Sequence, residues 1–100
     1  MEDPIIIVEN EINLRNYPNP FNPETKIAFN LPVSGKVKLE IFNIKGQKVK
    51  TLMDCTSAPG NYELIWNGRD DVGKSVSSGV YFYQLTAPSK TITKRMLMLK

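Results

Sequence analysis

The chain has 100 residues, of which 41% are hydrophobic and 23% are charged, and its formal net charge is +3. This length suits one domain with a real core, and the composition is that of an ordinary globular protein, not a disordered one. The cations are spread along the whole length, so the charge excludes the clustered footprint of a nucleic-acid-binding protein.

Histidine is absent, and Cys55 is the single cysteine. These facts exclude a Ser-His-Asp or Cys-His catalytic arrangement, a His-bearing zinc site and an internal disulfide. Cys55 lies in a polar stretch, so we expect an accessible thiol at a strand end or in a loop. The sequence shows no apolar run of transmembrane length and no signal-peptide pattern. We therefore expect a cytosolic protein or, as we favour, a domain from a longer secreted chain.

The first half of the chain alternates between apolar and polar residues over short segments. Residues 5–8 and 12–17 predict one broken opening strand, and residues 25–31 and 36–41 predict the next two strands. The side chains expected to face inward on these two strands are Ile27, Phe29, Leu31, Val37, Leu39 and Ile41. A turn follows at residues 43–46, where Gly46 suits a positive φ.

The second half predicts four more strands, at residues 47–53, 61–66, 80–87 and 92–99. A polar loop is expected over residues 67–74. The side chains expected to face inward are Val49, Leu52, Tyr62, Leu64, Trp66, Tyr81, Tyr83 and Leu85. Strands at roughly ten-residue spacing, without helical periodicity, predict a seven-stranded antiparallel β-sandwich of the immunoglobulin or fibronectin type. Trp66 is the expected central aromatic.

Residues 17–23 contain three prolines and two asparagines around two aromatic rings. We expect a rigid extended lead-in that covers one edge of the sandwich, because proline blocks strand addition. A proline-motif ligand for an aromatic groove is the alternative, although the segment lacks PxxP regularity.

Two groups of carboxylates invite a chemical interpretation. Asp70 and Asp71, with Asn67 and Gly73, suggest calcium, but they do not match the EF-hand spacing, and a tight loop requires the same residue types. A carboxylate pair for glycoside hydrolysis would have to come from Glu9, Glu11, Glu24, Glu40 and Glu63. We expect these glutamates on solvated faces, and we expect no catalytic, cofactor or metal site.

The last predicted strand differs from the others because its two faces are both apolar over residues 96–99. One explanation is that the strand is covered on both sides, with residues 5–8 as the cover. The other is a surface for a partner, either a preceding domain or a transport receptor. Phe42 and Phe82, predicted to point outward on neighbouring strands, would extend that surface.

Several blocks of residues, in one order, carry a resemblance to a known family. They include the Tyr17 to Thr25 segment, Asn43-Ile44-Lys45-Gly46-Gln47, Trp66-Asn67-Gly68, Ser78-Gly79-Val80-Tyr81-Phe82-Tyr83 and residues 94–100. Over residues 14–100 the chain resembles the type A C-terminal sorting domain of type IX secretion substrates. It is also similar to the immunoglobulin-like domain of the flagellar hook-capping protein. Residues 1–13 are then a linker, with any cleavage site, or an added first strand.

The resemblance implies a non-catalytic tail of a larger secreted protein, without a cofactor. A signal peptide upstream would take the parent to the periplasm, and the outer-membrane translocon would recognise the folded tail. A sortase-like peptidase would then remove the tail, leaving the cargo anchored at the cell surface or released. The implied recognition strand consists of Lys94, Arg95, Met96, Leu97, Met98, Leu99 and Lys100, and the neighbouring support consists of Gly79, Tyr81 and Tyr83.

Other functions remain open on the same fold, because a sandwich does not determine function. The main alternative is an adhesive or carbohydrate-binding accessory module of a secreted enzyme, for which only Phe42 and Phe82 supply candidate exposed aromatics. A structural domain of a flagellar or cell-wall scaffold is another. A small enzyme ranks last, because no acid, base or nucleophile is arranged for catalysis.

Overall fold

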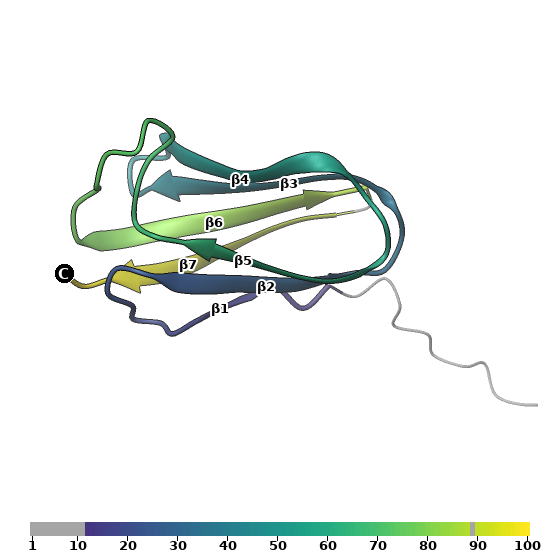
Figure 1. Ribbon diagram of the computed structural model, residues 1–100, viewed down its shortest axis with the longest axis horizontal. Coiled ribbons are helices and arrows are strands. Elements are labelled where there is room, and N and C mark those ends of the chain that lie inside the picture. Colours follow the sequence, from purple (N-terminus) through teal and green to yellow (C-terminus); the bar gives the residue numbers. More distant parts are fainter. Residues whose placement is uncertain (1–11, 89) are drawn as a thin grey trace, which may run out of the picture.

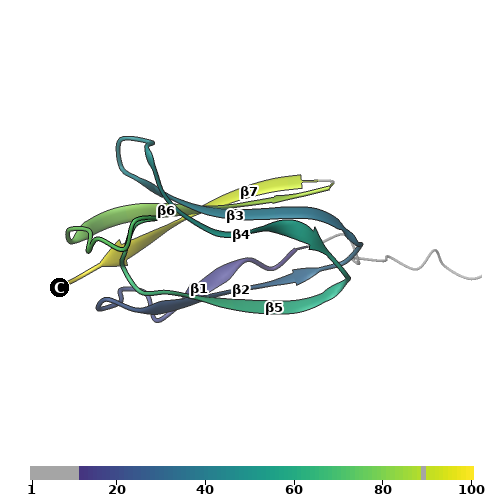
Figure 2. The same ribbon diagram turned by 45° about the horizontal axis from the view of Figure 1, so that its top comes forward.

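The computed structural model describes residues 12–88 and 90–100, and this part of the chain forms a two-layered β-sandwich (Figures 1 and 2). The strands are β1 (Arg15–Tyr17), β2 (Thr25–Leu31), β3 (Gly35–Asn43), β4 (Lys48–Ser57), β5 (Gly60–Trp66), β6 (Gly79–Ala87) and β7 (Lys90–Met98). One sheet has the order β1-β2-β5 and the other has the order β4-β3-β6-β7. All strand pairs are antiparallel, which confirms the predicted seven-stranded sandwich.

The core forms where the alternating apolar residues of the two sheets meet. All six side chains predicted to face inward on β2 and β3 are at most 2% exposed. On β6, Tyr81, Tyr83 and Leu85 are buried as predicted, whereas Val80, Phe82, Gln84 and Thr86 are half-buried on the opposite face. The period of two in side-chain direction therefore determines which face of each strand enters the core.

Trp66 is the central aromatic of the core, as predicted, and it is fully buried. Its ring lies 5.8 Å from that of Phe21 and 5.2 Å, edge to face, from that of Tyr81. The indole Nε1 donates a hydrogen bond of 2.9 Å to the backbone oxygen of Arg69, so the buried polar atom has a partner. This cluster connects the segment before β2, the end of β5 and the start of β6.

The turn between β3 and β4 forms because Asn43 and Gly46 satisfy its geometry. The Asn43 Oδ1 atom accepts hydrogen bonds from the backbone N–H groups of Lys45 (2.9 Å) and Gln47 (3.0 Å). Gly46 has a φ of 83°, which confirms the prediction made for this residue. The side chains of Ile44 and Lys45 take no part in closing the turn.

The strand β4 is longer than the sequence pattern indicated. β4 extends to Ser57 instead of ending at Met53, so Cys55 lies inside the strand, opposite Val37. Its thiol is exposed, as predicted, and lies 3.4 Å from the Ser57 hydroxyl. The polar residues 54–57 concealed this extension because they sit where β4 is a solvated sheet edge.

The opening strand is shorter than predicted, because β1 pairs with β2 only from Arg15 to Tyr17. Ile12 and Leu14, just before it, are nonetheless buried in the core. The predictions for residues 5–8, Glu9 and Glu11 fall outside the described residues, and the domain boundary at residue 14 stays a prediction. Within the described ranges, no helix is long and apolar enough to cross a membrane.

Candidate functional site

Residues 94–98 of the implied recognition strand lie on β7, at the edge of the four-stranded sheet (Figure 1). Leu99 and Lys100 follow the strand, which ends at Met98, one residue earlier than predicted. β7 pairs along its whole length with β6, which carries the three residues of the implied support. Gly79 lies opposite Met98, Tyr81 opposite Met96, and Tyr83 opposite Lys94. The structure therefore brings the two sets of residues together, position by position, in one ladder.

The side chains of this strand divide between the core and the surface. Met96 and Met98 point into the sandwich and are 1% and 0% exposed. Leu97 is half-buried on the outer face, and Arg95 and Leu99 are exposed. A partner at the surface can therefore contact Arg95, Leu97 and Leu99, whereas the two methionines hold the strand in place.

The outer edge of β7 is partly covered by the proline-rich segment, residues 17–23, as the sequence predicted. The Phe21 N–H donates to the Leu97 backbone oxygen at 3.0 Å, and the Leu99 N–H donates to the Phe21 oxygen at 2.8 Å. Phe21 and Met98 form a parallel bridge. The Asn19 Oδ1 atom accepts a hydrogen bond of 3.0 Å from the Leu97 N–H, so this segment pairs with the strand by backbone and side chain alike.

Lys100 is also held, although its side chain is exposed. Its N–H donates to the Ser78 hydroxyl at 3.0 Å, and its ammonium donates to the Ser75 hydroxyl at 2.6 Å. The loop before β6 thus contacts the residues after β7. Arg95, Leu97, Leu99 and Lys100 consequently project from a backbone that is hydrogen-bonded on both sides.

An apolar patch lies on the outer face of the four-stranded sheet, beside these residues. Phe42 and Phe82 are directly opposite each other on β3 and β6, and Val80 is opposite Leu97 on β6 and β7. All four side chains are half-buried and lie outside the main core cluster. This confirms that the two phenylalanines point outward on neighbouring strands.

Charged residues flank the patch, and a groove borders it. Lys48 on β4 lies opposite Phe42, and Arg95 on β7 lies opposite Phe82. A cationic residue therefore lies on each side of the pair of phenylalanines. A groove of about 350 Å³ lies between Pro20, Arg95 and Leu97, next to the covered edge. The half-buried phenylalanines offer no exposed aromatic platform, and this arrangement does not favour the carbohydrate-binding alternative.

The implied support residues, Gly79, Tyr81 and Tyr83, fix the backbone at the start of β6 and pack its inner face. Gly79 has a φ of 148°, a conformation that side-chain-bearing residues rarely adopt. The Tyr81 hydroxyl donates to the Ser77 backbone oxygen at 2.6 Å, the link that fixes a tyrosine corner at the start of such a strand. Burial raises the pKa of the Tyr83 phenol above its ordinary value, which keeps the buried group neutral.

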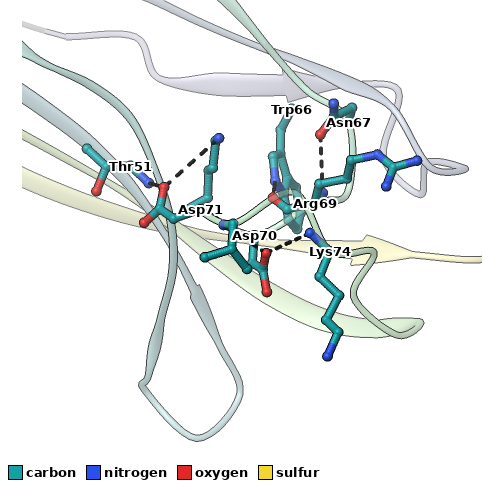
Figure 3. Close-up of polar contacts among 9 residues, drawn as sticks. Thr51, Trp66, Asn67, Arg69, Asp70, Asp71 and Lys74 are labelled. Atoms are coloured by element: carbon teal, nitrogen blue, oxygen red, sulfur yellow. Dashed lines mark hydrogen bonds and ion pairs between the residues drawn. The ribbon is translucent and has the colours of Figure 1, made fainter.

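The loop that suggested calcium is organised by its own carboxylates (Figure 3). The Asp70 Oδ1 atom accepts hydrogen bonds from the N–H groups of Val72 (3.1 Å) and Lys74 (2.8 Å). The Asp71 Oδ1 atom accepts one of 3.1 Å from the Thr51 N–H and lies 4.0 Å from the Lys50 ammonium. These bonds give both aspartates a structural role, and within the described ranges no group of three acidic or cysteine side chains could hold a metal.

The remaining predicted carboxylates lie apart from one another. Glu63 is exposed on β5, where the Tyr17 hydroxyl donates to it and Lys26 lies 3.8 Å away. The Tyr17 hydrogen bond, aided by the Lys26 charge, lowers the Glu63 pKa, so the carboxylate stays ionised. Glu24 is exposed, and Glu40 lies on a strand of the other sheet. The arrangement therefore does not place a general acid with a raised pKa beside a carboxylate base, as glycoside hydrolysis requires.

Sequence reasoning missed Asn19, Ser75 and Ser78 as partners of the last strand. Asn19 was visible as part of a proline-rich cover, but its particular hydrogen bond depends on a contact between residues 78 positions apart. The two serines lie in a polar loop, where their residue type has no distinctive pattern.

The comparisons with known proteins agree with this geometry. The model of a family described as "Secretion system C-terminal sorting domain" matches residues 15–99. A search of curated proteins finds no match. Among solved structures, the dimeric latent PorU of Porphyromonas gingivalis has a TM-score of 0.68 at 17% identity, with 88% of this chain and 9% of that chain covered.

Two further solved structures share the fold. PorZ of the same organism, described as an essential surface component of the type-IX secretion system, has a TM-score of 0.60 at 23% identity, and 93% of this chain is covered. FlgD from P. aeruginosa has a TM-score of 0.53 at 27% identity, with coverage of 74% of this chain and 58% of that chain. The chain spans only 9% and 12% of PorU and PorZ, so it corresponds to a small part of each.

Proposed function

Because this chain belongs to the family of secretion-system C-terminal sorting domains, we propose that the outer-membrane translocon of type IX secretion recognises it through outward side chains of β7 and of the two residues that follow it. The family is one of sorting signals, and its domains mark secreted or cell-surface proteins. In the proposal, Arg95, Leu97, Leu99 and Lys100 contact the translocon. Met96 and Met98 keep the strand in register instead of touching the partner.

The observation that best supports this assignment is the fixed backbone around those four residues. The pairing of β6 on one side and Phe21 on the other holds the strand between Arg95 and Leu99. A strand that is already ordered loses little conformational entropy when a partner binds, which favours recognition of the folded domain over an unfolded peptide. Gly79, Tyr81 and Tyr83 take the role of supports for this order.

The other steps of the route belong to the same proposal. A signal peptide on the parent protein takes it to the periplasm before the sorting domain acts. A sortase-like peptidase then removes the domain and leaves the cargo attached to the cell surface or released. The activity of the parent resides in its other domains, because this domain supplies a signal and no chemistry.

A secretion assay tests the proposal. Residues 1–100, placed behind a signal peptide and a fluorescent reporter in a type IX-competent host, should carry the reporter to the surface or the medium. The variant R95E/L99S changes two exposed side chains of the strand and should leave the reporter in the periplasm. Deleting the whole strand is a poorer test, because it removes Met96 and Met98 from the core.

A matched control carries the same two kinds of change outside residues 94–100, at the far end of β7 and on β5. The variant K90E/I65S also reverses one exposed cation and replaces one exposed apolar residue, which is 53% exposed. It should be secreted like the unchanged domain. Equal secretion of the R95E/L99S variant, or periplasmic retention of the unchanged folded domain, would contradict the proposal and favour the accessory-module alternative.

A further inference from the structure

Three separate segments at one end of the sandwich each expose an apolar side chain with a lysine just after it. Ile44 precedes Lys45 in the β3–β4 turn, Val72 lies two residues before Lys74 in the β5–β6 loop, and Leu99 precedes Lys100 after β7. The apolar residues are 69%, 86% and 51% exposed, respectively. We refer to these six residues as the lysine end.

The three segments form one surface. Figures 1 and 2 show the β3–β4 turn, the β5–β6 loop and the C mark at the same end of the sandwich. Ile44 lines a groove with Ser78 and Val80, and Ser78 binds the Lys100 backbone. Asn43, at the base of the same turn, lines a second groove with Val72. The turn therefore lies between the other two segments.

The fold does not account for the apolar side chains at these positions. The turn is closed by Asn43 and Gly46, and the loop is closed by Asp70 and by Gly73, which has a φ of 87°. Neither Ile44 nor Val72 belongs to the core or packs against it. A polar residue at either position would serve the turn as well and would avoid exposing apolar surface to water.

The charges of this end complement an anionic surface. Within the described ranges, Lys45, Lys74 and Lys100 take part in no ion pair, because the three ion pairs found there use Lys26, Lys36 and Lys50. Of the two carboxylates in this loop, Asp71 is paired with Lys50, whereas Asp70 accepts hydrogen bonds from neutral backbone N–H groups. The three lysines therefore outnumber the one carboxylate of this loop that lacks a cationic partner, and the Lys100 ammonium also donates to the Ser75 hydroxyl.

We propose that the lysine end docks on a lipid bilayer with anionic headgroups, inserting Ile44, Val72 and Leu99 at the headgroup boundary while the lysines contact phosphates. Apolar side chains ringed by cations are the pattern of interfacial membrane binding, where burial of apolar area and attraction to anionic lipid act together. The first described segment, purple in Figure 1, begins at the opposite end, so docking leaves that end turned away from the bilayer.

Vesicle binding measures this contact separately from secretion. The 100-residue chain is mixed with sedimentable vesicles of phosphatidylglycerol and phosphatidylcholine, or of phosphatidylcholine alone, at low salt. It should sediment with the anionic vesicles and stay in solution with the neutral ones. The variants I44S/V72S and K45Q/K74Q leave β7 unchanged. K45Q/K74Q, which removes two positive charges, should weaken binding to anionic vesicles about twenty- to thirtyfold, at about fivefold per lysine.

The control is V33S/I65S, which replaces two other apolar residues that are 40% and 53% exposed. It should bind anionic vesicles like the unchanged chain, and circular dichroism establishes that all variants are folded. No sedimentation of the unchanged chain with anionic vesicles would overturn the proposal, and so would unchanged binding by I44S/V72S. If I44S/V72S blocks secretion and the unchanged chain does not bind vesicles, the lysine end binds a protein instead of a bilayer. Arg95 lies outside the lysine end, so secretion by the single variant R95E is a separate readout, and failure of the sorting proposal is recognised independently.

Discussion

The Sδ atom of Met98 occupies the space into which a side chain on Gly68 would project. A Cβ added to Gly68 would lie 3.2 Å from that sulfur and 3.1 Å from the Pro23 backbone oxygen. Gly68 also has a φ of 76°, which a residue with a Cβ adopts only with strain. The Trp66-Asn67-Gly68 sequence is therefore coupled to the last strand through close packing.

Replacing Gly68 by alanine should destabilise the domain more than the same change at Gly73. Both glycines have positive φ, so both variants carry a backbone cost of about 1–2 kcal/mol. Only Gly68 is crowded, because a Cβ on Gly73 would meet nothing within 4 Å. Denaturant unfolding followed by the fluorescence of Trp66 measures both free energies. Equal losses would show that the contact with Met98 relaxes at no cost.

Met98, the last residue of β7, and Leu99, which follows it, should respond very differently to truncation. Met98→Ala removes a side chain that is 0% exposed and should lower the free energy of unfolding by about 2–5 kcal/mol. Leu99→Ala acts at a residue that is 51% exposed and should change it by no more than about 0.5 kcal/mol. The same unfolding measurement compares them. A large loss for Leu99 would mean that its side chain is packed in solution.

Removal of the Tyr17 hydroxyl should raise the pKa of Glu63. The hydrogen bond from Tyr17 is the largest cause of the lowered pKa, and the Lys26 charge is second. In an NMR titration of the Glu63 carboxyl, Tyr17→Phe should therefore raise the pKa more than Lys26→Gln does. The reverse order would assign the effect to charge rather than to the hydrogen bond.

The same shift determines the sign of a small pH effect on stability. Because the folded pKa of Glu63 lies below the unfolded value, its contribution is present above about pH 4.3 and is lost as the pH falls through the folded pKa. Glu63→Gln should flatten the acid limb of the stability profile. A steeper acid limb in that variant would contradict the sign.

The Asp70 loop should depend on its carboxylate whether or not calcium is present. Asp70→Ala leaves the N–H groups of Val72 and Lys74 without their acceptor and should cost about 1–2 kcal/mol. Added calcium should not change the thermal midpoint of the unchanged domain, because the Oδ1 atoms of Asp70 and Asp71 already accept backbone hydrogen bonds. A thermal unfolding midpoint that rises when calcium is added would support a calcium site in this loop.

The sequence pattern was informative where one face of a strand is buried and the other is solvated. Val37, Leu39 and Ile41 alternate with charged residues, so their direction could be read directly, and the outward direction of Phe42 and Phe82 followed. β4 could not be bounded in this way, because residues 54–57 are polar on both faces of an edge strand. The missing information there is the pairing with β3, which local composition does not contain.

The candidate site was predictable as a strand but not as a set of contacts. Residues 94–100 were identified through their resemblance to a family. Alternation could not show that Met96 is inward and Leu97 outward, because both faces of residues 96–99 are apolar. The bonds from Asn19, Ser75 and Ser78 depend on how distant loops meet at one end of the sandwich. The crowding of Gly68 by Met98 has the same origin.

The hydrogen bond between Asn19 and Leu97 has a consequence for the order of events in the cell. It joins residues 78 positions apart, so nearly the whole domain must be synthesised before Leu97 can meet its partner. Contacts of such long range form late and slowly, because a large loop has to close first. The fixed form of β7 thus exists only once the segment around Asn19 and the last strand have folded against each other. A half-folded domain does not display it.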